Sequence, residues 1–415
     1  MKLRHICAAA GLAAFMTTTA ANATVHRVFP GESIQAAIDG AAPGDTILVE
    51  PGTYKYSPPA AAAGKYYYGL RIQTDNLRLI GKGDGSKVRL VYAGPPDRAG
   101  DVGAGVYAAP EGCEYWMEDN KPEGEDCRTR KLKGFYLRGF SVEGFPRNGI
   151  QTRWVDGFEF VRNASVNNLN NGIYPTLSAN GLVQNNVSYG SLDTAMWVAG
   201  SENVRVIGNK VFGSVIGFEI TVSNNVLFTQ NKVYNNTVGI GLFHPNGAGN
   251  PPTAVEALEN WVIEHNDVRD NNRPNDATHG FQSLLPPGVG ILLVGVSGHT
   301  IAKNTVEGND FVGIGLLGWC TATASFPGYD CGAKPPVIDG VFYDPAVSNN
   351  LVAQNKVSGN GGSPPPIAID FLAADMTYFT LEGWSSGNCF EKNKPSGFTF
   401  VSSEGQLPTD GCEKP

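Results

Sequence analysis

A short pattern of small and apolar residues recurs along the middle of the chain with a period of about 22 residues. An apolar residue that follows a small one, usually glycine, stands at positions 150, 173, 196, 218 and 240, and again at 291 and 314. Later in the same units an Asn-x-Val sequence begins at positions 209, 231, 266, 304 and 355. A chain built from such units buries each repeat only against its neighbours, so it forms a rod rather than a globule.

Each unit contains three short apolar runs, which we interpret as three strands of one coil. The pattern predicts an all-β fold, a single-stranded right-handed parallel β-helix of about 10 or 11 coils. Alternation along a strand places Ile150, Ile173 and Met196 inward and their neighbours outward. The recurrent Asn is expected to form a ladder of stacked amides inside a turn, and the recurrent Gly is expected to be a turn residue.

The two ends of the chain carry distinct signals. Residues 1–23 combine a basic start, a short apolar run and the small-residue exit Ala21-Asn22-Ala23, which is typical of a removable signal peptide. Residues 24–415 are expected to form one domain. Ser33 to Asp39 is expected to be a short helix that covers the first coil, and the segment from Cys389 to Cys412 is expected to close the last. No stretch approaches the ~20 apolar residues of a transmembrane helix.

Six cysteines follow the predicted signal peptide and fall into three neighbouring pairs. We expect disulfides 113–127, 320–331 and 389–412, as suits a periplasmic or secreted protein. The competing interpretation, a zinc site, lacks a Cys-x-x-Cys spacing. A net charge of −8 with no basic patch argues against a nucleic-acid partner. We expect a monomer.

The segment "SIQAAIDGAAPGDTILVEPGTY" and the coils that contain "NNGIYP", "SLDTAMWVAGSENV" and "IGFEITVSNNV" resemble the pectate-lyase-like β-helix superfamily. The central region resembles a secreted family of parallel β-helix repeat proteins. The superfamily includes pectate lyases, alginate lyases, mannuronan epimerases, polygalacturonases and members without catalytic activity. The resemblance therefore implies a β-helix that binds a polysaccharide. The Asp-Pro-His signature of epimerases and the Arg-x-Lys pattern of polygalacturonases do not occur.

Four long insertions interrupt the repeat, near residues 109–131, 244–256, 273–287 and 318–349. All four are placed at the ends of first strands of their coils. Loops of this length on a rigid scaffold are often functional. We therefore expect a groove over the sheet of first strands, with decorative surface loops as the alternative.

Outward positions on the first strands supply the candidate site. We assign catalytic roles to Glu219, His244 and Tyr174, and substrate binding to five further residues: Trp197, Arg153, Arg147, Asp193 and Phe243. Tyr174 and Trp197 form either a flat surface for a sugar or a ladder that stabilises the sheet. Glu219 beside an indole is expected to have a raised pKa. Strand geometry places Asp193 roughly 14 Å from Glu219, too far for the carboxyl pair of a glycosidase.

Two functions fit these residues. The first is a polysaccharide-active enzyme, with a lyase or epimerase favoured over a glycoside hydrolase. Such an enzyme needs a base, a proton donor and a cation to neutralise a uronate. The second is an exported β-helix that binds a glycan or a protein without catalysis. No metal site is predicted and no cofactor is indicated; calcium is compatible with the fold, but no cluster of carboxylates marks a site for it.

Overall fold

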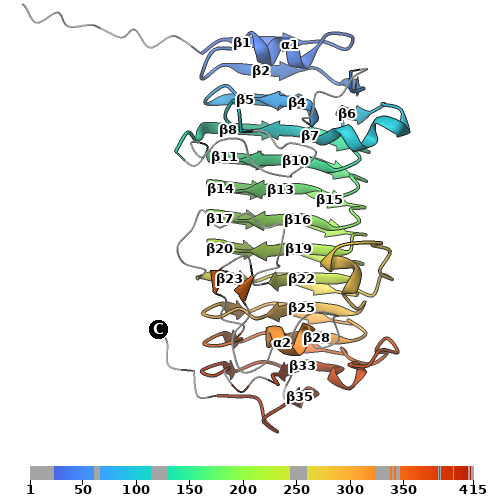
Figure 1. Ribbon diagram of the computed structural model, residues 1–415, viewed down its shortest axis with the longest axis vertical. Helices are drawn as coiled ribbons and strands as arrows, with labels where there is room; N and C mark the ends of the chain where they lie inside the picture. Colours follow the sequence, from blue (N-terminus) through green and yellow to red (C-terminus); the bar gives the residue numbers. More distant parts are fainter. Residues whose placement is uncertain are drawn as a thin grey trace, which may run out of the picture.

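The computed structural model is a rod of stacked coils, a right-handed parallel β-helix with its first coil at one end of the rod and its last coil at the other (Figure 1). It describes residues 23–59, 66–113, 127, 129–243, 259–323, 337–338, 341–342, 346–381, 383, 385–395, 397–409 and 412. Three parallel sheets of 11, 12 and 10 strands run the length of the rod, which confirms the expected fold and coil number. We name them sheet 1, sheet 2 and sheet 3, after the first, second and third strand of each coil.

The sheets consist of short strands joined by turns. Sheet 1 contains β4 (Tyr67–Ile72), β7 (Val102–Ala108), β10 (Asn148–Arg153), β13 (Ile173–Thr176), β16 (Thr194–Ala199), β19 (Ile216–Thr221), β22 (Val238–Phe243), β25 (Val289–Val294), β28 (Val312–Leu317), β33 (Ala374–Phe379) and β35 (Phe400–Ser402). Sheet 2 contains β1 (Val25–Val28), β2 (Thr46–Val49), β5 (Leu77–Gly81), β8 (Leu132–Arg138), β11 (Val155–Val161), β14 (Ala179–Gln184), β17 (Glu202–Ile207), β20 (Asn224–Thr229), β23 (Trp261–Glu264), β26 (Thr300–Ala302), β31 (Leu351–Ala353) and β34 (Cys389–Glu391). Sheet 3 contains β3 (Gly52–Tyr56), β6 (Val88–Tyr92), β9 (Phe140–Glu143), β12 (Ala164–Val166), β15 (Val187–Tyr189), β18 (Lys210–Phe212), β21 (Lys232–Tyr234), β24 (Asp267–Arg269), β27 (Thr305–Glu307) and β32 (Lys356–Ser358).

The core is a continuous column of inward side chains. Ile150 pairs in register with Ile173, and Ile173 with Met196. The column continues through Phe218, Ile240, Ile291, Ile314 and Met376. All of these residues belong to one buried apolar cluster, so the predicted inward column is confirmed.

Amide ladders satisfy the polar groups of the turns, as expected. In the longest, each Asn Nδ2 donates to the Oδ1 of the next Asn at about 3 Å, close to the usual hydrogen-bond length. Its members are Asn163, Asn186, Asn209, Asn231, Asn266, Asn304, Asn355 and Asn393. Because these side chains also donate to backbone carbonyls, the turns are sealed against water.

The recurrent glycine of sheet 1 has a different role from the expected one. A Cβ on Gly217 would lie 2.9 Å from both Asn236 Nδ2 and Val233 Cγ1, inside the rod. Gly217 and the next residue, Phe218, therefore both face inward, and the residue before them faces outward. Ile216 accordingly packs in an apolar cluster on the outer side of sheet 1. The glycine is thus required by close packing rather than by a turn conformation.

The ends are closed as predicted. Helix α1 (Ile34–Asp39) begins at Ser33, whose side chain accepts a hydrogen bond from Ala36 N, and it buries Ile34 and Ile38 against the first coils. Disulfides join Cys113 to Cys127 and Cys389 to Cys412, as expected. Of the predicted 320–331 pair, Cys331 lies outside the described residues. Among the helices of the described part, none has the length and apolarity needed to cross a bilayer.

The predicted insertions adjoin strands of sheet 1. Residues 109–131 follow β7 and residues 244–256 follow β22; most of the first segment and all of the second lie outside the described part. Residues 273–287 precede β25 and contain the short helix η3 (Phe281–Leu284). Residues 318–349 follow β28 and contain α2 (Trp319–Thr323), β29 (Val337–Ile338) and β30 (Val341–Phe342). Two further short helices, η1 (Pro96–Asp101) and η4 (Asp370–Leu372), precede β7 and β33.

Candidate active site

The outer side of sheet 1 carries the predicted site residues in the expected register. Gln151 pairs with Tyr174, and Trp197 pairs with Glu219 on the next coil. Glu219 in turn pairs with Gly241. The outward column read from the sequence is therefore correct.

This outer side is not the open groove that the insertions suggested. Arg153 and Phe243 are 0% exposed, and Glu219 is 4% exposed. Trp197 is half-buried. The predicted groove over sheet 1 is not open at these positions, because the outer face at Arg153, Glu219 and Phe243 is buried.

From β22 onward the outer side is apolar. The Phe243 ring occupies the space that a side chain on Gly241 would need. It packs edge to face with Phe281, with 5.3 Å between the ring centres. Phe281 in turn stacks on Trp319 at 6.2 Å. Phe243 was predicted to bind substrate, but its burial in this apolar cluster gives it a packing role.

From β10 to β19 the outer side is polar, although it is buried. Asn148 Nδ2 donates to Gln151 Oε1 at 2.9 Å, and Asn148 Oδ1 accepts from Asn171 N at 3.2 Å. Asn171 Oδ1 accepts from Thr194 N at 3.2 Å. We call this set, with the two carboxyl groups described next, the polar network: Asn148, Gln151, Asn171, Asp193, Thr194 and Glu219. A buried, connected polar network on an otherwise apolar face is a candidate site.

Two carboxyl groups meet at Thr194. The Thr194 hydroxyl donates to Glu219 Oε2 at 2.5 Å and lies 3.4 Å from Asp193 Oδ1. The two carboxylate oxygens are therefore no more than about 6 Å apart, near the separation found in glycosidase carboxyl pairs. The expected separation of roughly 14 Å is wrong, because it followed strand positions and ignored the reach of the Glu219 side chain back along its strand.

Burial changes the proton affinity of both carboxyl groups. It raises the pKa of Asp193 to about 7, although hydrogen bonds from Thr194 and Asn171 oppose the change. Burial, and then the charge of Asp193, raises the pKa of Glu219 well above its usual value. The pair therefore retains a proton near neutral pH. Because Glu219 is the more buried of the two, we place that proton on Glu219.

These raised pKa values make the stability of the protein depend on pH. Both carboxyl groups have a higher pKa in the folded state than in the unfolded chain, where it is near 4, so the contribution of the pair to stability is complete at or below about pH 4. It is expected to fall as the pH rises toward 7, by on the order of 2 kcal/mol. Glu219→Gln should reduce this fall, whereas Glu159→Gln, at an exposed position on sheet 2, should leave it unchanged. The free energy of unfolding of the wild type, Glu219→Gln and Glu159→Gln is measured by denaturant titration at pH 4.5 and pH 8. An equal loss of free energy between the two pH values in all three proteins would contradict the assignment.

Tyr174 and Trp197 stack on each other. Their ring centres are 4.6 Å apart with an angle of 13° between the planes, so the two faces are in mutual contact. Trp197 Nε1 also donates to Thr221 Oγ1 at 3.0 Å, which fixes the indole beside Glu219. Of the two alternatives, the geometry supports the ladder rather than a flat surface for a sugar.

The other predicted residues are not brought to the carboxyl pair. Arg153 is fully buried, with its guanidinium 6.0 Å from the Trp154 ring. Arg147 lies before β10, where its guanidinium covers the Tyr66 ring at 4.4 Å. His244 lies outside the described residues.

Comparison with known proteins agrees with this architecture. A family model described as a right handed β-helix region matches residues 148–326. The solved A-module of the mannuronan C-5 epimerase AlgE4 of Azotobacter vinelandii has a TM-score of 0.56 at 15% identity, over 91% of this chain and 93% of that one. This chain has the fold of a right-handed parallel β-helix. A DFA-IIIase of Arthrobacter chlorophenolicus A6 matches this β-helix with a TM-score of 0.53 at 14% identity, over 93% of this chain and 86% of that one. No curated protein matches the chain in sequence.

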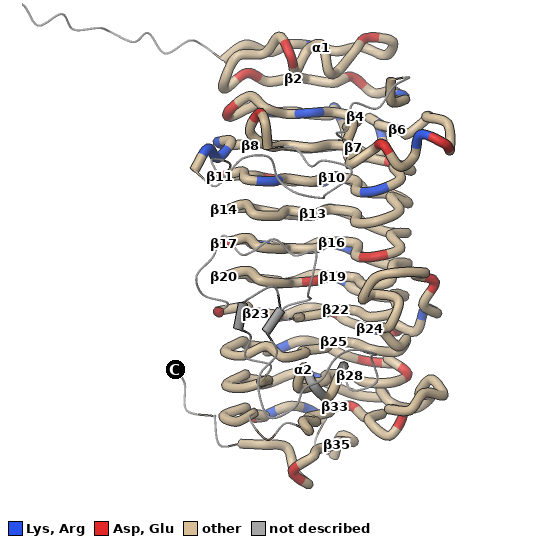
Figure 2. The backbone as a smooth tube through the Cα atoms, viewed as in Figure 1, with Lys and Arg blue, Asp and Glu red and all other residues tan. Residues whose placement is uncertain are grey.

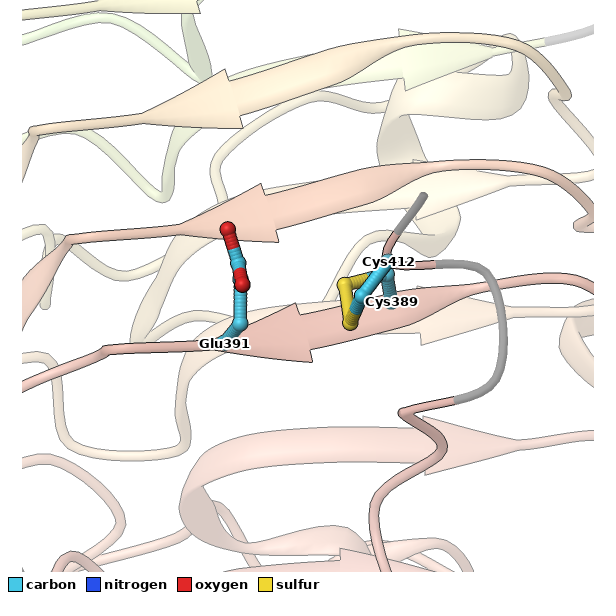
Figure 3. Close-up of side chains that lie close together, drawn as sticks. All are labelled: Cys389, Glu391 and Cys412. Carbon is cyan, nitrogen blue, oxygen red and sulfur yellow. A yellow bond between two sulfur atoms is a disulfide. The ribbon is translucent and has the colours of Figure 1, made fainter. Parts of the chain in front are cut away.

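The C-terminal end of the β-helix brings three potential metal ligands together. Within the described residues, ligand atoms of Cys389, Glu391 and Cys412 lie within 4.8 Å of one another. The two sulfur atoms are bonded to each other (Figure 3). A disulfide has no thiolate to offer a metal, so this trio closes the last coil and is not a metal centre.

The sequence analysis missed Thr194 and Asn171, which connect the carboxyl groups to the rest of the polar network. Strict alternation counted back from Met196 places Thr194 inside the rod. The inward residue before Met196, Ala195, occupies the column of Gly217 and shifts Thr194 to the outer side. The sequence signal that could have identified the pair is the run Asp193-Thr194, which is followed one coil later by the outward Glu219.

Proposed function

We propose that this β-helix is an exported carbohydrate-active enzyme that cleaves a glycosidic bond with Glu219 and Asp193. The observation that carries the proposal is the carboxyl pair joined by Thr194, buried and with both pKa values raised. One group that holds a proton near neutral pH and one that can lose it are the two parts that glycoside hydrolysis requires. The disulfides support export.

The roles of the two groups follow from their surroundings. Glu219, the more buried, donates its proton to the leaving oxygen as the bond breaks. Asp193, half-buried, acts as the carboxylate that attacks the anomeric carbon or stabilises the positive charge that develops there. A separation of no more than about 6 Å favours direct attack over activation of an intervening water, and so favours retention of configuration.

The fold is compatible with this chemistry. Solved proteins of the same fold are named as a mannuronan epimerase and a DFA-IIIase. Their identity to this chain is low, so their names support a saccharide as the class of ligand without indicating a particular sugar. Lyase or epimerase chemistry at a uronate would use the same pair, as base and acid.

The test is incubation of the purified chain from Thr24 onward with a panel of neutral and acidic polysaccharides. New reducing ends and unsaturated-uronate absorbance are followed together. New ends without absorbance are the expected result. Absorbance with new ends would replace hydrolysis by elimination at the same pair, and NMR of the sugars would detect epimerisation. If no sugar is changed, the catalytic proposal is wrong, and binding without turnover becomes the function to measure.

A further inference from the structure

A groove of about 450 Å³ lies on the rod where the strands of sheet 1 begin. Its floor is formed by turn residues of three successive coils, Arg147, Asn170 and Leu192. One wall is the end of η1, at Ala99 and Gly100, and the other is the insertion before β25, at His279 and Gln282. The groove is therefore an opening beside the buried face of sheet 1.

The groove has a local charge opposite to that of the whole protein. The chain carries a net charge of −8, yet none of the described lining residues is acidic. Figure 2 shows few charged residues on the middle coils that form its floor. Arg147 donates to the Tyr66 hydroxyl and stacks on the Tyr66 ring, but it forms no ion pair with a carboxylate among the described residues. Its charge is thus held in place and available.

The groove leads to the carboxyl pair. Asn170 N donates to Arg147 O, which stacks the two residues on successive coils. Asp193 follows the lining residue Leu192, and its backbone carbonyl accepts from Ile216 N on the next coil. Asp193 is half-buried, whereas Glu219 behind it is almost fully buried. A ligand seated on Arg147 therefore approaches the pair from the Asp193 side.

We propose that this groove binds an anionic sugar ring, with the Arg147 guanidinium paired to its carboxylate or sulfate. Asn170 and Gln282 offer amides to the hydroxyl groups, and the exposed Leu169 and Leu192 contact the apolar face of the ring. The inference rests on the proposed function. It places the saccharide along the strand-start edge of sheet 1 instead of across its buried face.

The test compares three trimers of one sugar skeleton: galactose, sulfated galactose and galacturonate. Their affinities for the Glu219→Gln protein, which holds substrate without turning it over, are measured by calorimetry at low and high salt. We expect at least one charged trimer to bind about 10- to 100-fold more tightly than the neutral one, with salt weakening the difference. The trimer that binds best decides between carboxylate and sulfate.

Arg147→Gln should remove the preference for charge, while Arg205→Gln, at an exposed position on sheet 2, should keep it. Equal affinity for all three trimers, or an unchanged preference in Arg147→Gln, would overturn the inference. The two proposals fail separately. Turnover without a preference in affinity for charged trimers would support the proposed function and contradict the groove. A preference without turnover would support the groove and contradict the proposed function.

We also infer, from a separate observation, that removal of residues 1–23 completes the N-terminal end of the rod. Thr24 N donates to Asp45 Oδ1 at 2.8 Å. The other oxygen of Asp45 lies 2.8 Å from His26 Nε2 and accepts from Ala42 N at 3.0 Å, and Asp45 is only 5% exposed. Cleavage after Ala23 turns the Thr24 amide into an ammonium group, so a hydrogen bond from an uncharged donor to the buried carboxylate becomes an ion pair.

The test compares the chain that begins at Thr24 with the same chain carrying a Gly-Ser extension. We expect the extension to lower the melting temperature by about 2 °C. The Asp45→Asn background should abolish this difference. Equal melting temperatures for the two chains would overturn the inference, as would mass spectrometry of the exported protein that finds a first residue other than Thr24.

Discussion

Replacing Glu219 by glutamine is expected to lower turnover of the saccharide substrate by about 100- to 10,000-fold, with a much smaller change in KM. Glutamine keeps the shape of the side chain and an oxygen to accept the hydrogen bond from Thr194, but it cannot transfer a proton. The loss therefore falls on the chemical step rather than on binding. Measurement of kcat and KM on the substrate found in the panel tests this directly.

The pH profile gives a second readout of the same pair. The wild-type rate should be bell-shaped, with an acidic limb from ionisation of the pair near the Asp193 pKa of about 7 and a basic limb from loss of the second proton. Glu219→Gln should remove the basic limb. Asp193→Asn should be as damaging as Glu219→Gln, because the two groups act as a unit. Glu159→Gln is the matched control, and full activity in Glu219→Gln would exclude the pair from catalysis.

The repeat made the scaffold predictable. Inward residues such as Ile150, Ile173 and Met196 must stack on one another, so their spacing along the sequence reports their spacing along the rod. The Asn ladder is predictable for the same reason, since each amide bonds to its counterpart on the next coil. Local sequence and three-dimensional neighbours coincide in a repeat protein, and register follows from periodicity.

The site depended on features that periodicity does not carry. Two consecutive inward residues, Ala195 and Met196, break the alternation and turn Thr194 outward. The Glu219 side chain then extends back along its strand toward Thr194, and this direction brings it close to Asp193. Burial of the outer face likewise depends on insertions, such as the one that places Phe281 over Phe243, and their course is not encoded in the repeat. The positions of the site residues were therefore predictable, whereas their contacts and exposure were not.

Removing one amide from the middle of the ladder should be among the most damaging single changes to stability. Asn266 Oδ1 accepts from the backbone N and the Nδ2 of Asn231, and Asn266 Nδ2 donates to Phe228 O and Asn304 Oδ1, all at 2.9 to 3.0 Å. Asn266→Ala leaves these groups buried without partners, at an expected cost of about 3 to 5 kcal/mol in the free energy of unfolding. Urea denaturation followed by circular dichroism measures it.

The matched control lies in a second amide ladder, on the surface of sheet 2. Asn225 donates to Asn203 Oδ1 and accepts from Asn260, but it is exposed, so water replaces these bonds when the side chain is removed. Its φ of 50° makes glycine the appropriate replacement. Asn225→Gly should cost less than about 1 kcal/mol. The two ladders share the stacking of amides on successive coils, but only the ladder of Asn266 is buried. Similar losses of stability in the two variants would therefore mean that stacking, and not the pairing of buried polar groups, is how the buried ladder stabilises the fold.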